Sequence, residues 1–197
     1  MKLLSVLIIA LFFVSCGEQN EISILKTDIN DGLSEEHRNE FRRDIVEVTD
    51  GVYSGIGFGL ANSIMIETSD GLVIVDTLGS EERATEMLEE FRKISSKPIK
   101  AIIYTHNHLD HIGGTTIFAQ EGEPEIYAQE NILYNIDNIS TTIRPIIFER
   151  SARQFGIPLS EDKIVHQGIG GFLEINAGST IGLLRPTITF NDKLDLK

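Results

Sequence analysis

The chain has 197 residues, an apolar fraction of 41% and a formal net charge of −13. This length fits one domain with a sizeable core, and the apolar fraction argues against intrinsic disorder. The acidic balance argues against a nucleic-acid partner, which needs a basic footprint, and any site for an anionic substrate must be built locally.

The first residues have the pattern of an export signal. Lys2 supplies a positive start, and the apolar run Leu3–Val14 is too short to cross a bilayer as a helix. The run leads to Cys16, the only cysteine of the chain. This junction resembles a bacterial lipobox, which implies that residues 1–15 are a lipoprotein signal peptide and that Cys16 is lipidated. The predicted location is the cell envelope, anchored by lipid to a bacterial membrane on its periplasmic side or at the cell surface; the alternative is an ordinary signal peptide with an incidental cysteine.

The next segments lead from a tether into a strand-rich block. Residues 16–33 are polar and predict a tether, and residues 34–197 predict one domain, beginning with a helix at residues 34–44. Asp70-Gly71 predicts a hairpin turn, and the unbroken apolar run that follows suits a strand buried on both faces. Strands are expected at residues 46–48, 52–57, 63–67 and 72–75.

A helix and another buried strand come next. Ser80 is suited to cap the helix, and Pro98 ends it. Its predicted buried face consists of Ala84, Met87, Leu88, Phe91 and Ile94. The remaining elements are expected as strands at residues 101–104, 126–128 and 187–190 and as helices at residues 131–138 and 145–155. The alternation of strand and helix predicts an α/β fold with a site beyond the strand ends.

Three imidazoles and one carboxylate follow the strand at residues 101–104: His106, His108, Asp110 and His111. Imidazole nitrogen and carboxylate oxygen suit zinc, iron or manganese. The spacing of His106 and His108 lets both side chains face one metal from an extended backbone, while Asp110 and His111 can face a second metal. Gly113-Gly114 is expected to let the backbone approach the metal site closely. A histidine-rich surface loop is the alternative, but the position after a buried strand favours a metal site.

This HxHxDH pattern resembles the signature of the metallo-β-lactamase superfamily. The resemblance implies an α/β fold of the αββα sandwich type and a site for two zinc ions. Asp76, which closes the apolar run at residues 72–75, matches the aspartate that braces the metal loop in this superfamily. Such a brace is physically reasonable because a metal-bound imidazole needs an acceptor for its other nitrogen. The alternative for Asp76 is a solvent-exposed loop aspartate.

Within the superfamily, the chain is most similar to the front part of the bacterial alkyl sulfatases. The similar segments, in order, are residues 45–54, 71–78, 100–106, 150–159, 167–170 and 185–187. The resemblance implies a zinc-dependent hydrolase of medium to long alkyl sulfate esters, in which zinc activates water and Asp110 is both a metal ligand and a catalytic residue. In the full-length family a homodimer is also possible.

The same resemblance predicts an incomplete sandwich. In alkyl sulfatases the third histidine ligand, the bridging carboxylate and the residues that clamp sulfate follow well downstream, whereas this sequence ends at Lys197. His166 is the only later histidine, and its setting does not suit a ligand loop. We therefore expect a truncated domain that, in isolation, hydrolyses dodecyl sulfate far more slowly than a complete alkyl sulfatase.

Two other functions are compatible with the sequence. The first is another hydrolase of the same fold that acts on a thioester or a lactam. The second is a truncated, catalytically inactive, lipid-anchored remnant. The number of metal ligands separates the enzymes from the remnant, because zinc hydrolases use three protein ligands for an ion. Assays with a sulfate ester and a thioester separate the two enzymes.

Overall fold

The computed structural model describes residue 36 and residues 39–159, 166–175 and 178–196. The predicted signal peptide, Cys16, the tether and residues 34, 35, 37 and 38 lie outside the described residues. The helix expected at residues 34–44 is wrong at its end, because residue 40 is the last helical one and a strand begins at Asp44. Within them, no helix is both long enough and apolar enough to cross a bilayer.

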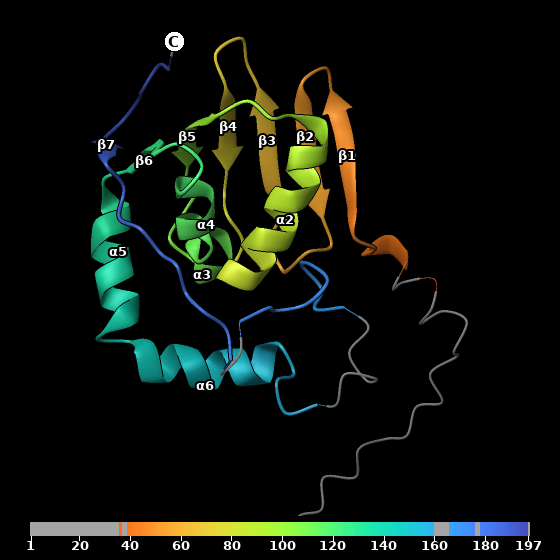
Figure 1. The fold of residues 1–197 in the computed structure, drawn as a ribbon. Coiled ribbons are helices and arrows are strands. Elements are labelled where there is room, and N and C mark those ends of the chain that lie inside the picture. Colours follow the sequence, from red (N-terminus) through yellow and green to blue (C-terminus); the bar gives the residue numbers. More distant parts are fainter. Residues whose placement is uncertain (1–35, 37–38, 160–165, 176–177, 197) are drawn as a thin grey trace, which may run out of the picture.

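One mixed sheet of seven strands organises the described chain, with the strands in sequence order (Figure 1). The first four strands are joined as antiparallel neighbours, and the last three continue the sheet in parallel from β4. The strands are β1 (Asp44–Thr49), β2 (Val52–Ile56), β3 (Ser63–Glu67), β4 (Leu72–Val75), β5 (Ile99–Ile103), β6 (Glu125–Gln129) and β7 (Ile188–Phe190). Hairpins can join antiparallel strands, whereas the parallel strands need crossovers, which the helices supply.

Three helices, α2, α3 and α4, lie on one face of this sheet (Figure 1). In chain order, the helices that follow β4 are α2 (Glu81–Ile94), α3 (Leu109–Ile112), α4 (Thr115–Ala119), α5 (Asn131–Ser140) and α6 (Arg144–Gln154). Ser80 caps α2 as predicted, since its side chain accepts a hydrogen bond from the Arg83 amide. Ile94 was expected on the buried face but is 39% exposed, because it is the last residue of the helix and so lies beyond the reach of the core.

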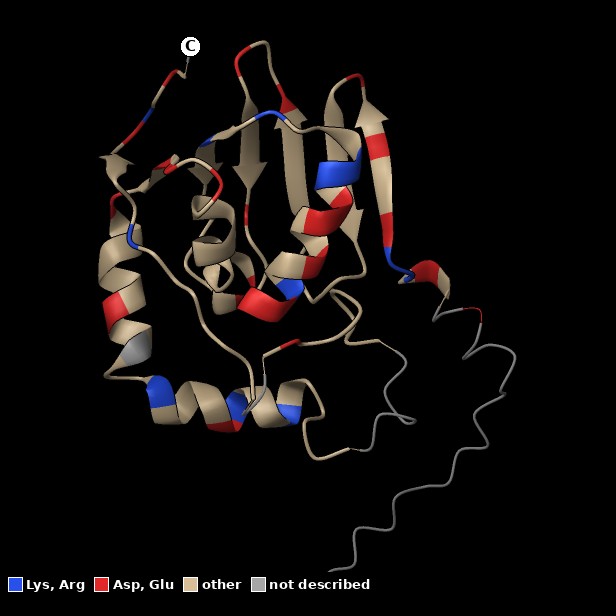
Figure 2. Cartoon of the chain, viewed as in Figure 1, with Lys and Arg blue, Asp and Glu red and all other residues tan. Residues whose placement is uncertain are grey.

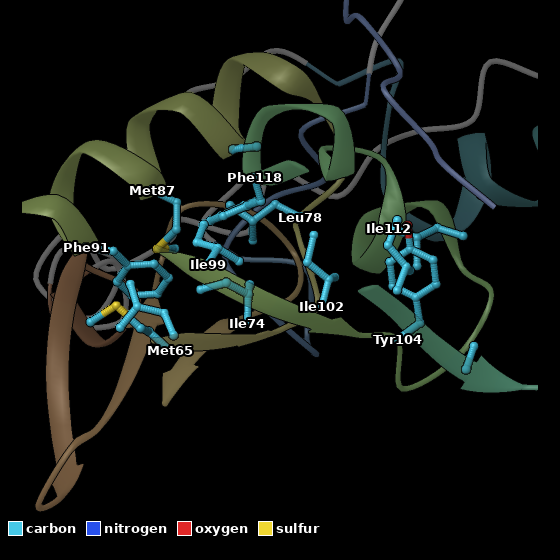
Figure 3. Packing of buried hydrophobic residues seen from close by; sticks show 14 of the residues in the cluster. Met65, Ile74, Leu78, Met87, Phe91, Ile99, Ile102, Tyr104, Ile112 and Phe118 are labelled. Carbon is cyan, nitrogen blue, oxygen red and sulfur yellow. The ribbon is translucent and has the colours of Figure 1, made fainter. Parts of the chain in front are cut away.

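The hydrophobic core fills the space between the sheet and these helices (Figure 3). Met65, Ile74 and Ile102 come from three neighbouring strands, while Phe91 and Phe118 come from α2 and α4. All five side chains are almost fully buried. Removing each phenylalanine ring from water contributes about 2–3 kcal/mol of favourable transfer free energy. This core joins β5, which leads into the predicted histidine ligands, to the helix α2.

The opposite face of the sheet is only partly covered. On β4, Leu72 and Ile74 are buried, whereas Val73 and Val75 keep partial exposure. The prediction that this strand is buried on both faces is therefore wrong for the described residues, because helices pack on one face of the sheet. The described chain thus corresponds to one half of the predicted αββα sandwich.

The distribution of charged side chains reflects the acidic composition of the chain. Figure 2 shows acidic residues along α2 and β1 and in the turns that join the strands, with basic residues interspersed. Arg144, Arg150 and Arg153 give α6 a basic character. Long-range attraction of an anionic substrate is not expected from such a distribution, so anion binding depends on local groups.

Candidate metal centre

The predicted ligands occupy the segment that leaves the carboxyl end of β5. His108 has an extended backbone and is the N-cap of α3, which begins at Leu109. Asp110 and His111 therefore lie on a short helix that the sequence did not predict. The difference follows from length, because a helix of four residues is too short to produce a periodic hydrophobic pattern.

The four predicted ligands are adjacent in space. The ring centroid of His106 lies 4.7 Å from that of His108 and 4.0 Å from that of His111. Nε2 of His111 lies 3.4 Å from Oδ2 of Asp110. In the described part of the chain, no three His, Cys, Asp or Glu side chains already converge on one point. The donors are thus gathered without forming a closed coordination shell.

Asp76 orients two of the imidazoles. This carboxylate is 4% exposed. It accepts hydrogen bonds from His111 Nδ1 at 2.7 Å, the Thr105 hydroxyl at 2.6 Å and the Thr105 amide at 2.8 Å. Because a carboxylate only accepts, Nδ1 of His111 carries the proton and Nε2 keeps the lone pair that a metal requires. The Thr105 hydroxyl gives its proton to Asp76, so its oxygen accepts from Nδ1 of His106, 3.1 Å away, which leaves Nε2 of His106 free as well.

The surroundings shift the pKa values of His106 and His111 in opposite directions. Burial lowers the pKa of His106, and the neighbouring His111 and His108 lower it further. For His111, burial acts downwards, but the hydrogen bond to Asp76 and the charges of Asp76 and Asp110 outweigh it and raise the pKa. The raised pKa means that His111 binds a proton more readily than His106 does, so metal binding at His111 weakens sooner as the pH falls.

The turn between β4 and α2 packs against the segment that carries the predicted ligands. Asp76 and Leu78 have φ values of 60° and 62°, which non-glycine residues adopt rarely. The Thr77 amide donates to the His111 carbonyl at 2.6 Å. A Cβ at Gly113 would meet the backbone of Gly79. Gly113 therefore allows the ligand segment to pack on this turn.

Sequence reasoning missed a chain of buried hydroxyl groups beneath the ligands. The Tyr104 hydroxyl lies 2.6 Å from Oγ1 of Thr115, which lies 2.9 Å from Oγ1 of Thr77. Thr77 in turn lies 3.2 Å from the His111 carbonyl. Burial raises the pKa of Tyr104, so this phenol stays protonated and donates. Isolated hydroxyl residues inside apolar segments have no spacing pattern that would identify them beforehand.

Other candidate features lie apart from this cluster. His166 stacks on Phe41 with a centroid distance of 4.9 Å, and its Nδ1 accepts a hydrogen bond from the Gly168 amide. A cavity of about 450 Å³ between β1 and α2 is lined by residues such as Arg43 and Glu86 and by none of the predicted ligands. The predicted ligands thus lie apart from this cavity, beyond the carboxyl end of β5.

The donor set fits a divalent metal of the zinc type. It supplies three imidazoles and one carboxylate, and Asp76 and Thr105 leave Nε2 of two imidazoles available. The ring centroids of the three imidazoles lie 4.0 and 4.7 Å apart, so the donors share one region at the end of β5. The arrangement is thus compatible with metal-assisted hydrolysis.

The chain is similar to known proteins over most of its length. Residues 56–174 match the sequence profile of the Metallo-beta-lactamase superfamily. A linear primary-alkylsulfatase from a Pseudomonas species is 44% identical over 138 residues, which are 66% of this chain and 26% of that protein. The alkyl/aryl-sulfatase BDS1 from Saccharomyces cerevisiae is 31% identical over 157 residues, which are 77% of this chain and 24% of that protein.

Among solved structures, the fold is similar to the stereoselective inverting sec-alkylsulfatase Pisa1 from Pseudomonas sp.. The TM-score is 0.69 at 23% identity, and the match covers 80% of this chain and 26% of that chain. The chain thus spans about a quarter of the length of the relatives that it matches.

Proposed function

Because the chain belongs to the metallo-beta-lactamase superfamily, we propose that it forms the metal-binding half of a zinc-dependent hydrolase of alkyl sulfate esters. The observation that carries this proposal is the cluster of His106, His108, Asp110 and His111 at the end of β5, braced by Asp76. Its similarity to alkylsulfatases favours sulfate esters over other substrates of the superfamily.

In the proposed centre, the four ligands divide between two zinc ions. His106 and His108 would hold one ion, and Asp110 and His111 would hold the other. Zinc, when bound, supplies Lewis acidity that lowers the pKa of water to about 7 and neutralises charge on the sulfate oxygens. The Asp110 carboxylate lies beside Nε2 of His111. It would therefore face the same zinc ion, at which the ester would react.

The protein supplies orientation for this chemistry. Asp76 fixes the tautomer and ring direction of His111, and Thr105 does the same for His106. Because the chain carries a formal net charge of −13, the anionic ester must be attracted by groups within the site. The alkyl chain of the proposed ester is inferred from the similarity to alkylsulfatases.

The proposed activity is tested by comparing three substrates with the natural full-length protein that contains this sequence. With zinc bound, we expect release of sulfate from dodecyl sulfate at a typical enzymatic rate of about 1 per second or faster. A thioester and a β-lactam are expected to react far more slowly. Faster turnover of either would indicate another hydrolase of the fold, and no turnover of any would indicate the inactive remnant.

We also propose that lipid on Cys16 anchors the protein to a membrane of the cell envelope. The support is the sequence pattern of Lys2, the apolar run Leu3–Val14 and the single cysteine. Cys16→Ala is expected to block lipidation and to move the protein from the membrane fraction to the soluble fraction. Metabolic labelling with a palmitate analogue measures the first effect directly. Unchanged labelling and fractionation of the variant would show that the anchor lies elsewhere.

A further inference from the structure

A buried carboxylate joins three distant segments of the chain behind the candidate metal centre. Glu174 is 4% exposed. Its Oε2 accepts the Leu60 amide at 3.0 Å, and its Oε1 accepts the Gly79 amide at 2.7 Å. Burial raises the pKa of this carboxyl, and the two backbone hydrogen bonds partly oppose that effect. A buried charged group is costly unless it is hydrogen-bonded, so this arrangement needs a reason.

One of its two partners belongs to the turn that carries Asp76. Each of the four residues 76–79 of this turn makes a hydrogen bond either to the segment that carries the ligands or to Glu174. Asp76 bonds to His111, Thr77 donates to the His111 carbonyl, Leu78 accepts from the Gly114 amide at 3.1 Å, and Gly79 donates to Glu174. Two of these residues, Asp76 and Leu78, have positive φ values. Such conformations persist only where the surroundings hold them.

We propose that Glu174 is a positioning residue for the metal centre: it holds the Leu60 and Gly79 amides and thereby keeps the 76–79 turn in the conformation that places Asp76 against His111. This inference rests on the proposed function, since it concerns the same metal centre. Glu174 reaches the turn through its carboxylate, both oxygens of which accept a backbone amide. Its charge also helps to raise the pKa of His111, an effect that Gly59→Ala keeps and Glu174→Gln removes.

The slot around the carboxylate is shaped by two glycines. A Cβ at Gly59 would lie 2.5 Å from Oε1 of Glu174, and a Cβ at Gly79 would lie 2.8 Å from the same atom. Both positions are therefore restricted to glycine as long as the carboxylate stays in place. Glutamine at position 174 has the same size, but it offers one acceptor oxygen and one NH₂ group, so one backbone amide would face a donor.

The test compares zinc affinity and cobalt spectra of Glu174→Gln with those of the unmodified full-length protein. Zinc affinity, measured by competition with a chromophoric chelator, is expected to fall about tenfold, as for other groups that orient metal ligands. The visible spectrum of the cobalt-substituted protein is expected to change, because it reports the ligand geometry. A purely stabilising role would leave both readings unchanged in the folded variant.

Two control variants show the effects of a changed net charge and of a weakened core. Glu67→Gln removes the same charge at the other end of the sheet, where Glu67 contacts Ser95 and Lys97. Phe91→Leu weakens the core at α2, and Figure 3 shows Phe91 apart from Leu78 of the turn. Both are expected to keep zinc affinity within about twofold of the unmodified protein.

A second route reaches the same carboxylate without changing it. Gly59→Ala is expected to displace Glu174 and to lower zinc affinity to a similar extent. In the Glu174→Ala background, Gly59→Ala is expected to add little, because the clashing carboxylate is absent; such non-additivity identifies a direct contact. If Glu174→Gln fails to fold, Gly59→Ala carries the test.

The outcomes distinguish this inference from the proposed function. If the unmodified protein binds no zinc or cobalt, the proposed metal centre is wrong and the inference falls with it. If the unmodified protein binds zinc while Glu174→Gln and Gly59→Ala keep its affinity and its cobalt spectrum, the metal centre stands and the role of Glu174 is overturned. A loss in both variants with no change in the two controls supports the inference.

Discussion

Replacing His106 and His108 together by alanine is expected to lower zinc affinity by more than about 100-fold, since loss of ligand-orienting groups alone costs 10–100-fold, and to abolish ester hydrolysis. The two rings lie 4.7 Å apart at the end of β5, and they would supply both donors from this segment to one ion. Removing them leaves Asp110 and His111 to hold the remaining metal. The measurement is zinc competition with a chromophoric chelator, followed by release of sulfate from dodecyl sulfate.

His166→Ala is the matched control for this variant. It removes one imidazole that stacks on Phe41 and accepts from the Gly168 amide. Zinc affinity and activity are expected to stay within about twofold of the unmodified protein. If His166→Ala were as damaging as the double replacement, His166 would complete the metal site and the assignment of ligands would have to change.

Substitution of Asp76 is expected to have the second largest effect. Asp76→Ala removes the acceptor for the Thr105 amide, the Thr105 hydroxyl and Nδ1 of His111. Leaving such groups without an acceptor in a buried position is expected to cost about 3 kcal/mol of unfolding free energy. Zinc affinity is expected to fall 10–100-fold. Urea unfolding and chelator competition measure the two effects.

Asp76→Asn separates orientation from stability. Asparagine tolerates the positive φ of 60° at this position better than alanine does, so the backbone is less strained. Its NH₂ group can donate to Nδ1 of His111, which would move the ring proton to Nε2 and block the lone pair that binds the metal. We therefore expect a smaller loss of stability than for alanine but a similar loss of zinc affinity.

Asp137→Asn is the control for charge removal, because Asp137 on α5 forms an exposed ion pair with Arg185. It is expected to change zinc affinity by less than about twofold, since exposed ion pairs contribute little. Unchanged zinc affinity in Asp76→Asn would mean that Asp76 stabilises the fold without orienting His111.

Local patterns predicted much of the fold because their causes are local. The strands β3 and β4 were predicted with the bounds that the structure has, since the Asp70-Gly71 turn separates two short apolar runs. The N-cap of α2 was predicted because Ser80 precedes an acidic first turn. The short helix α3 was not, because four residues produce no periodicity.

The contacts behind the ligands could not be predicted from the sequence. The bonds from Glu174 to Leu60 and Gly79 cross 114 and 95 positions. Their donors are backbone amides, which every residue except proline possesses. The packing of Gly113 against the carbonyl of Gly79 was not predicted either, because it involves a turn whose positive φ values have no signature in Asp76 or Leu78. Such features follow from the packing of distant segments.

The position of bound zinc tests the central claim most directly. Anomalous diffraction at the zinc edge, from crystals of the zinc-loaded protein, locates the ions without reference to activity. We expect zinc at about 2.0–2.1 Å from imidazole nitrogens of His106 and His108 and, for the second ion, beside Asp110 and Nε2 of His111. Zinc found only at other residues, or bound to Nδ1 of His111 with Asp76 displaced, would contradict the proposed metal centre.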